Sequence, residues 1–140
     1  MPLDLTSLRN AVLSLSESVA VAENEAFMRR LTEAEHRVVR AGVIQNFEVA
    51  YTVCCRDMDR WLGANVASDS VLGATRRQRF RLAARNRLIH DVGAWMAYHE
   101  TRNLTSHTYN AERTMLAYEA VRGFLHDAQY LLGALEARND

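Results

Sequence analysis

One polar segment of this chain, residues 101–110, contains residue types that together could act on a phosphodiester. Asn103 and His107 are one helical turn apart and share a face, while Arg102 lies on the neighbouring face, from which its long side chain can reach them. The arginine could hold a phosphate, and the histidine could serve as general base or acid for a ribose 2′-hydroxyl. These groups are the minimum set for RNA cleavage without a metal, and they would suit nucleotide binding equally well.

Hydroxyl groups complete the same segment. Ser106 and Tyr109 share the face of Arg102 and add hydrogen-bonding groups beside it. A second interpretation stays open from the spacing alone, because the polar end of a helix can contain such residues without a function. An arginine and a histidine five residues apart, as Arg102 and His107 are, form a weak signal by themselves.

The elements that must position this segment are helices. Apolar residues recur at steps of three and four through most of the chain, which is the pattern of amphipathic helices. Thr32 followed by Glu35 predicts a capping box, and Gly63 predicts the end of the long helix that begins there. We expect helices over about 4–23, 32–63 and 75–89, from about 90 into the segment around Arg102, and from Asn110 onward, with a loop over 64–74.

These elements predict an all-α fold in a single domain over residues 1–140, an up-and-down four-helix bundle with one additional short helix.

The net charge of zero excludes a globally basic nucleic-acid coat but leaves local patches open. Cys54 and Cys55 are neighbours in a helix, so we expect reduced thiols rather than a disulfide. Neither a signal peptide nor a long apolar run is present in the sequence, which predicts a cytoplasmic protein without a membrane partner.

Two stretches of the sequence resemble a known family. The stretch TRNLTSHTYN (101–110) resembles the signature of the HEPN superfamily, an arginine and a histidine with four residues between them, in the form that continues His-x-Tyr. The stretch GVIQNFEVAYTVCCRDMDRWL (42–62) resembles the second helix of one branch, the bacterial nucleotidyltransferase substrate-binding family. That branch includes HEPN toxins paired with a minimal nucleotidyltransferase, and the similarity covers about residues 3–137.

The resemblance implies a helical bundle that is commonly a homodimer, in which the motifs of two chains face one groove. Some members are RNases that need no metal, and their catalytic pair corresponds to Arg102 and His107. Asn103 follows the arginine as a polar residue, as is frequent in the superfamily. Tyr109 matches a tyrosine that a partner nucleotidyltransferase can modify with AMP. The chain lacks the Gly-Ser and paired-Asp signature of the transferase itself, so that activity would belong to a partner chain.

Two functions follow from these observations. The first is the HEPN toxin of a two-component toxin–antitoxin system, a metal-independent endoribonuclease acting as a homodimer or higher homo-oligomer and regulated by a cognate small nucleotidyltransferase. The alternative is a non-catalytic nucleotide- or substrate-binding subunit of a nucleotidyltransferase complex. A degenerate, purely structural dimer is a third interpretation, and the retained motif argues against it. We expect no cofactor and no metal in any of the three.

An arginine-rich segment departs from the family pattern, in which the charge before the motif is usually mixed. The segment reads TRRQRFRLAARNRLIHD (75–91), and six of the 17 arginines lie within twelve of its residues: Arg76, Arg77, Arg79, Arg81, Arg85 and Arg87. One interpretation is a contact with the RNA backbone or with an acidic partner. The other is a solvated helix face whose apolar residues pack inward.

Other charged residues are weaker candidates. Glu48 lies on an apolar helix between Phe47 and Val49, and Arg102 across the bundle would neutralise it. Asp57 and Asp59 alternate with arginines, which is typical of a solvated helix face. Four residues that could ligate a metal lack a metal-binding spacing and are expected as ordinary surface or core residues: His90, His99, Glu100 and His126.

Overall fold

The computed structural model describes residues 2–66, 68–107 and 111–139, and the side chains of residues 68, 105–107 and 111–114 lie outside that description. The described chain folds into helices without a strand, which confirms the predicted all-α fold. The helices are α1 (Thr6–Glu23), α2 (Glu25–Met28), α3 (Glu33–Asn65), α4 (Ser68–Val71), α5 (Arg76–Arg85), α6 (Val92–His107) and α7 (Ala111–Ala137).

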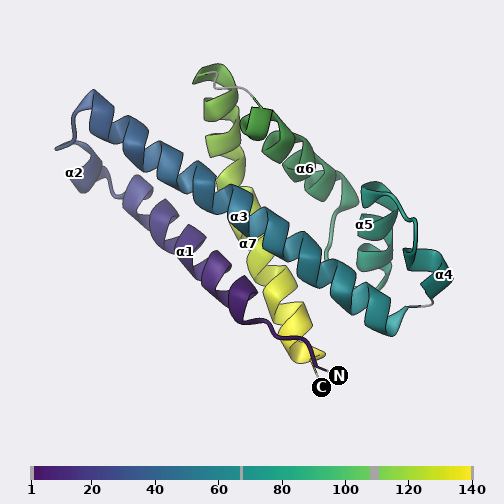
Figure 1. The fold of residues 1–140 in the computed structure, drawn as a ribbon. Helices are drawn as coiled ribbons and strands as arrows, with labels where there is room; N and C mark the ends of the chain where they lie inside the picture. The colour runs from purple at the N-terminus through teal and green to yellow at the C-terminus, as the bar shows by residue number, and fades with distance from the viewer. Residues whose placement is uncertain (1, 67, 108–110, 140) are drawn as a thin grey trace.

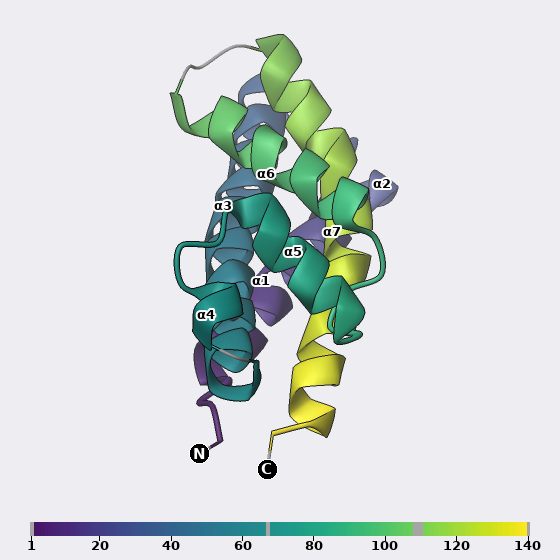
Figure 2. The same cartoon turned by 90° about the vertical axis from the view of Figure 1, so that its right-hand side faces the viewer.

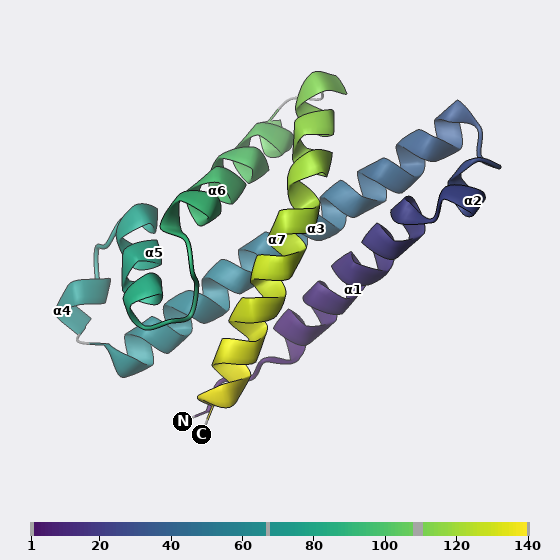
Figure 3. The ribbon, with the colours of Figure 1, turned by 180° about the vertical axis from the view of Figure 1, so that it is seen from behind.

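Four long helices, α1, α3, α6 and α7, run up and down in the order that the sequence predicts (Figure 1). α3 is the spine, because α1, α6 and α7 all pack against it. Figure 2 shows that α5 and α6 follow one another along one side of the bundle, and Figure 3 shows α7 running obliquely across α1 and α3. The site segment therefore lies on α6, which is held by α3 and α7.

The long helix begins where its capping residues predict. The hydroxyl oxygen of Thr32 accepts from the backbone N–H of Glu35 at 3.1 Å, and the Glu35 carboxylate accepts from the backbone N–H of Thr32 at 2.9 Å. The predicted end at Gly63 is wrong by two residues, because the helix continues to Asn65. Part of the loop expected over 64–74 is the single turn α4.

α5 ends at Arg85, four residues before the end expected from the sequence. Arg87 adopts a left-handed conformation with φ of 59°, and two backbone bonds close a Schellman motif, Leu88 N–H to Ala83 at 2.9 Å and Arg87 N–H to Ala84 at 3.1 Å. A helix end of this kind usually carries glycine, so the arginine concealed it in the sequence. Asp91 then caps α6 by accepting from the backbone N–H of Ala94 at 3.1 Å.

An aromatic cluster at the centre of the core fixes α6 against the other helices. Phe124 of α7 lies with its ring centroid 5.0 Å from Phe47 of α3 and 5.7 Å from Trp95 of α6. Tyr51 and Tyr98 complete the cluster, at 6.2 Å and 5.2 Å from the same phenylalanine. These edge-to-face and tilted contacts set the position of α6, and with it the position of the polar segment.

No helix in the described part of the chain combines the length and the apolar character that a membrane crossing requires.

Candidate functional site

Arg102 reaches from α6 onto the surface of α3. Its Nη2 donates to the hydroxyl oxygen of Thr52 at 3.3 Å, and that hydroxyl donates to the backbone carbonyl of Glu48 at 3.0 Å. Both atoms of α3 lie within one helical turn, so the guanidinium lies over that turn. A charged group that two helices orient in this way is suited to bind an anion such as a phosphate.

The ion pair predicted between Glu48 and Arg102 is not among the ion pairs of the described residues. Glu48 is half-buried rather than turned fully to solvent. Arg102 approaches α3 one turn further along, at Thr52, and a threonine hydroxyl takes the place that the prediction gave to the carboxylate. The register between α3 and α6 decides this difference, and that register depends on how the aromatic side chains pack.

His99 is the functional candidate that the sequence interpretation missed. Its Nδ1 lies 2.8 Å from the hydroxyl of Tyr51 on α3, and its Nε2 lies 3.3 Å from the amide nitrogen of Asn103. The structure thus joins Asn103 to α3 through an imidazole. The signal was present in the spacing, because His99 precedes Asn103 by four residues and so shares its face.

The surroundings of His99, Tyr51 and Cys55 keep these three side chains neutral at neutral pH. Burial lowers the pKa of the His99 imidazole below its ordinary value, and the positive charges of Arg76 and Arg102 lower it further, against a smaller opposite effect of Glu100. Burial also raises the pKa of the Tyr51 hydroxyl and of the Cys55 thiol, which lie one helical turn apart on α3. At neutral pH the fixed charge beside Asn103 is therefore positive and belongs to arginine.

The remaining motif residues lie partly outside the described structure. The backbone of α6 continues through Ser106 to His107, so the position of His107 follows Asn103 by one turn on the same face. The side chains of Ser106 and His107 are not described, and Tyr109 lies outside the described residues altogether. Their roles stay predictions.

The arginine-rich segment divides into two sets on α5. Arg76 and Arg79 face α3 and bind Asp59, at 2.6 Å and 2.9 Å, and the Arg76 guanidinium also lies 4.6 Å from the centre of the Phe80 ring. A second set on the outer face is exposed and comes at intervals of four residues: Arg77, Arg81 and Arg85. Neither interpretation of the sequence describes the first set, which is partly buried and paired with an aspartate of α3, whereas the outer arginines are available to a partner.

The solvated face predicted for the acidic residues of α3 is wrong. Asp57 is fully buried and pairs with Arg56 at 3.1 Å and Arg60 at 3.6 Å. Asp59 accepts from the two inward-facing arginines of α5. Asp57 follows Cys54 by three residues and precedes Trp61 by four, so it lies on the apolar stripe rather than opposite it.

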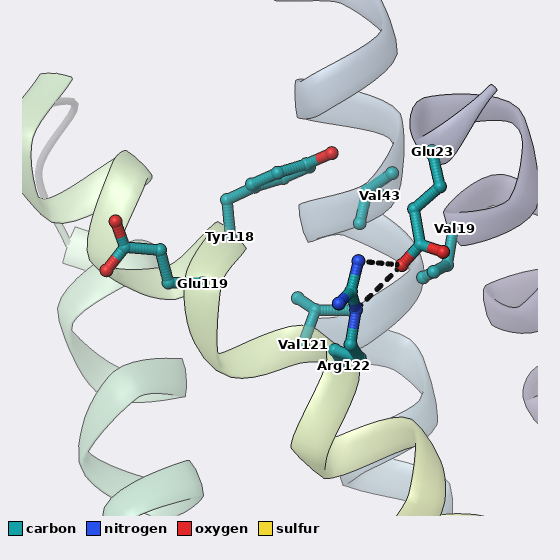
Figure 4. Close-up of a pocket in the computed structure, with 7 residues that line it drawn as sticks. All are labelled: Val19, Glu23, Val43, Tyr118, Glu119, Val121 and Arg122. Atoms are coloured by element: carbon teal, nitrogen blue, oxygen red, sulfur yellow. Dashed lines mark hydrogen bonds and ion pairs between the residues drawn. The ribbon is translucent and has the colours of Figure 1, made fainter. Parts of the chain in front are cut away.

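A cavity of about 300 Å³ lies between α1, α3 and α7 (Figure 4). Val19, Val43 and Val121 form its apolar part, and Arg122 at its edge is already bound to Glu23 at 2.7 Å. None of the predicted site residues lines it. The cavity is therefore separate from the cluster around Arg102.

The fold and the motif together define an up-and-down helical bundle of the HEPN type, with its polar residues along the penultimate long helix. The chain belongs to the family described as nucleotidyltransferase substrate binding protein like, whose sequence model matches residues 3–137. This result confirms the resemblance drawn from residues 42–62 and 101–110.

Individual relatives agree with this assignment. The chain is 33% identical to the probable ribonuclease HepT of Haemophilus influenzae over 138 residues, which cover 98% of this chain and 94% of that protein. A solved Haemophilus influenzae structure, described as the substrate-binding domain of a nucleotidyltransferase, superposes with a TM-score of 0.90 at 30% identity, over 95% of this chain and 99% of that one. A crystal structure from Thermus thermophilus shares the fold with a TM-score of 0.70 at 22% identity, over 91% of this chain and 98% of that one.

Proposed function

We propose that this protein is the ribonuclease toxin of a two-component toxin–antitoxin system, a metal-independent endoribonuclease controlled by a partner nucleotidyltransferase. The observation that carries the proposal is the placement of Arg102 and Asn103. They are neighbours on α6, about one turn before the position of His107. Arg102 is hydrogen-bonded directly to Thr52 of α3, and Asn103 is linked to α3 through His99 and Tyr51. Full-length similarity to the probable ribonuclease HepT supports the same activity.

In the proposed reaction the 2′-oxygen of one nucleotide attacks the adjacent phosphorus and the bond to the 5′-oxygen breaks. His107 takes the proton of the 2′-hydroxyl as general base, and Arg102 balances the charge that develops on the phosphate. A proton must also reach the departing 5′-oxygen, and His107 of a second copy supplies it if two motifs face one groove. The products are a 2′,3′-cyclic phosphate and a 5′-hydroxyl, and the reaction makes a homodimer the smallest complete enzyme.

Control of the toxin is assigned to Tyr109, the proposed site of modification with AMP by the partner nucleotidyltransferase. The added nucleotide would place a phosphate and a base two residues after His107. Such a group competes with RNA for the arginine and obstructs the groove sterically. Ser106 would add a hydroxyl to the same groove.

A second candidate function is a non-catalytic subunit that holds a nucleotide for the transferase. The family description and the description of the Haemophilus influenzae structure favour it, since both name substrate binding for a nucleotidyltransferase. Arg102 and Asn103 would then bind a phosphate and a base without a chemical step.

Cleavage of RNA by the purified protein in excess EDTA tests the proposal. We expect wild-type protein to cleave and His107→Ala to lose at least about 100-fold in rate, because general acid–base catalysis contributes about that much or more. His126→Ala is the matched control, since the His126 side chain is 82% exposed on α7 and has no place in the site. Equal cleavage by wild type and His107→Ala contradicts the proposal, and nucleotide binding without cleavage supports the second candidate.

The outer arginines of α5, Arg77, Arg81 and Arg85, are proposed to contact the RNA backbone. Removing all three charges as glutamine should lower the slope of log affinity against log salt by about two, because each phosphate contact in single-stranded nucleic acid contributes about 0.7. The measurement is RNA binding to the His107→Ala protein at several salt concentrations. Arg37→Gln, an exposed arginine on α3, is the control, and an unchanged slope in the triple variant would leave these arginines as a solvated face.

A further inference from the structure

His99 occupies a place in the cluster that the proposed reaction does not use. It is half-buried on α6, one turn before Asn103, and it contacts both Asn103 and Tyr51. Neither the Arg102–His107 motif nor the arginine-rich segment includes it. His99 therefore links Asn103 to Tyr51 beside the site, although the proposed reaction gives it no role.

The hydrogen-bonding groups around His99 fix where its proton lies. The amide nitrogen of Asn103 can only donate, so Nε2 of His99 must be the acceptor and carry no proton. A neutral imidazole then carries its proton on Nδ1, which donates to the Tyr51 oxygen at 2.8 Å. One direction of donation therefore runs from Asn103 through His99 to Tyr51.

We propose that His99 is a positioning residue that holds the Asn103 carboxamide with its oxygen turned away from the imidazole, as a fixed acceptor for the ribose hydroxyl of bound RNA. The two ends of a carboxamide point in different directions, so fixing the nitrogen on His99 also fixes the oxygen. An oriented acceptor recognises a 2′-hydroxyl, which is the group that distinguishes RNA from DNA. The hydroxyl that Asn103 accepts from belongs to a nucleotide next to the one whose 2′-hydroxyl gives its proton to His107, because a hydroxyl has only one proton to donate. This inference rests on the proposed ribonuclease function and adds a residue to it.

The arrangement works only with a neutral imidazole. A protonated His99 would present donors at both nitrogens, and the amide nitrogen of Asn103 would then face another donor. The charged and titratable groups around His99 are Arg76 from α5, Tyr51 from α3, and Arg102 and Glu100 on its own helix, and Cys55 of α3 acts in turn on Tyr51. Both arginines oppose protonation, so the contact is complete above the ordinary histidine pKa and is lost as the pH falls through the lowered value.

Nuclear magnetic resonance of the full chain, labelled with ¹⁵N-histidine and without RNA, tests the proton position. His99, identified by its loss in His99→Gln, should be neutral at pH 7 with the proton on Nδ1. Asn103→Asp should raise the pKa of His99, because a carboxylate beside Nε2 favours a protonated nitrogen. A proton on Nε2 of wild-type His99, or a charged ring at pH 7, overturns the proposal.

Kinetics test the positioning. His99→Ala should lower kcat for RNA cleavage by about five- to tenfold, the effect of one lost hydrogen bond, with KM within about twofold. His99→Gln should recover part of the loss, because its amide oxygen can accept from Asn103, and His126→Ala is the control. An unchanged kcat in His99→Ala overturns the positioning role. Absence of cleavage by wild type would refute the proposed function, whereas the resonance experiment would still decide how Asn103 is held.

Discussion

Replacing Arg102 with alanine is expected to lower kcat/KM for RNA cleavage by about 100- to 1000-fold, the usual effect of removing one group that stabilises transition-state charge. The guanidinium is hydrogen-bonded to Thr52 on α3 and belongs to the residue next to Asn103 on α6, so alanine removes the positive charge that this contact orients. We expect Arg102→Lys to fall between alanine and wild type, because an ammonium keeps the charge but loses the planar fork that binds two phosphate oxygens.

The control for this experiment is Arg122→Ala. Arg122 is an exposed arginine on α7 that binds Glu23 beside the cavity of Figure 4, outside the cluster around Arg102. Arg122→Ala removes the same kind of side chain and the same charge as Arg102→Ala, so a general effect of net charge on RNA binding would appear in both variants. Wild-type activity in Arg102→Ala would remove the arginine from the mechanism.

Replacing Phe124 with alanine is expected to lower the free energy of unfolding by about 3–5 kcal/mol. Phe124 is fully buried and touches aromatic rings of α3 and α6, including Phe47 at 5.0 Å and Tyr98 at 5.2 Å. The variant leaves a void at the point where three helices meet, and close-packed neighbours can fill it only in part. Urea unfolding followed by circular dichroism measures the change.

Leu116→Ala on the same helix is the matched control, because its side chain is 60% exposed and little apolar area is lost. We expect a change below about 0.5 kcal/mol there. If Phe124→Ala lowers the free energy of unfolding by less than about 1 kcal/mol, the aromatic cluster around Phe124 does not determine how α6 is held.

Periodicity predicted the bundle because the stripes of its long helices are read from local spacing alone. The capping box at Thr32 is local too, and it was found for the same reason. The end of α5 was missed because Arg87 takes a conformation that glycine normally marks. The burial of Asp57 runs against its alternation with arginines, which is typical of a solvated face, and agrees with its helical phase, which places it on the apolar stripe.

The site was predicted in part. The shared face of Asn103 and His107 follows from helix geometry, and the motif was found by resemblance. The contact of Arg102 with Thr52 joins residues 50 positions apart, and no local pattern encodes that distance. The same holds for the bond between Tyr51 and His99, 48 positions apart. Pairs of this kind depend on how two helices slide against one another, which the packing of the whole core determines.

The two ends of the chain are fastened to each other at one end of the bundle. Leu3 and Asn139 exchange two hydrogen bonds, from the Leu3 N–H at 2.7 Å and to the Leu3 carbonyl at 2.8 Å. Figure 1 shows both ends of the chain at the bottom of the view, whereas the end of α6 and the start of α7 lie at the top. Anything joined covalently to either end, whether an affinity tag, a fluorescent reporter or a second domain, would therefore leave the molecule away from Arg102. A circular permutant that links the two ends and opens the chain elsewhere should keep the site intact.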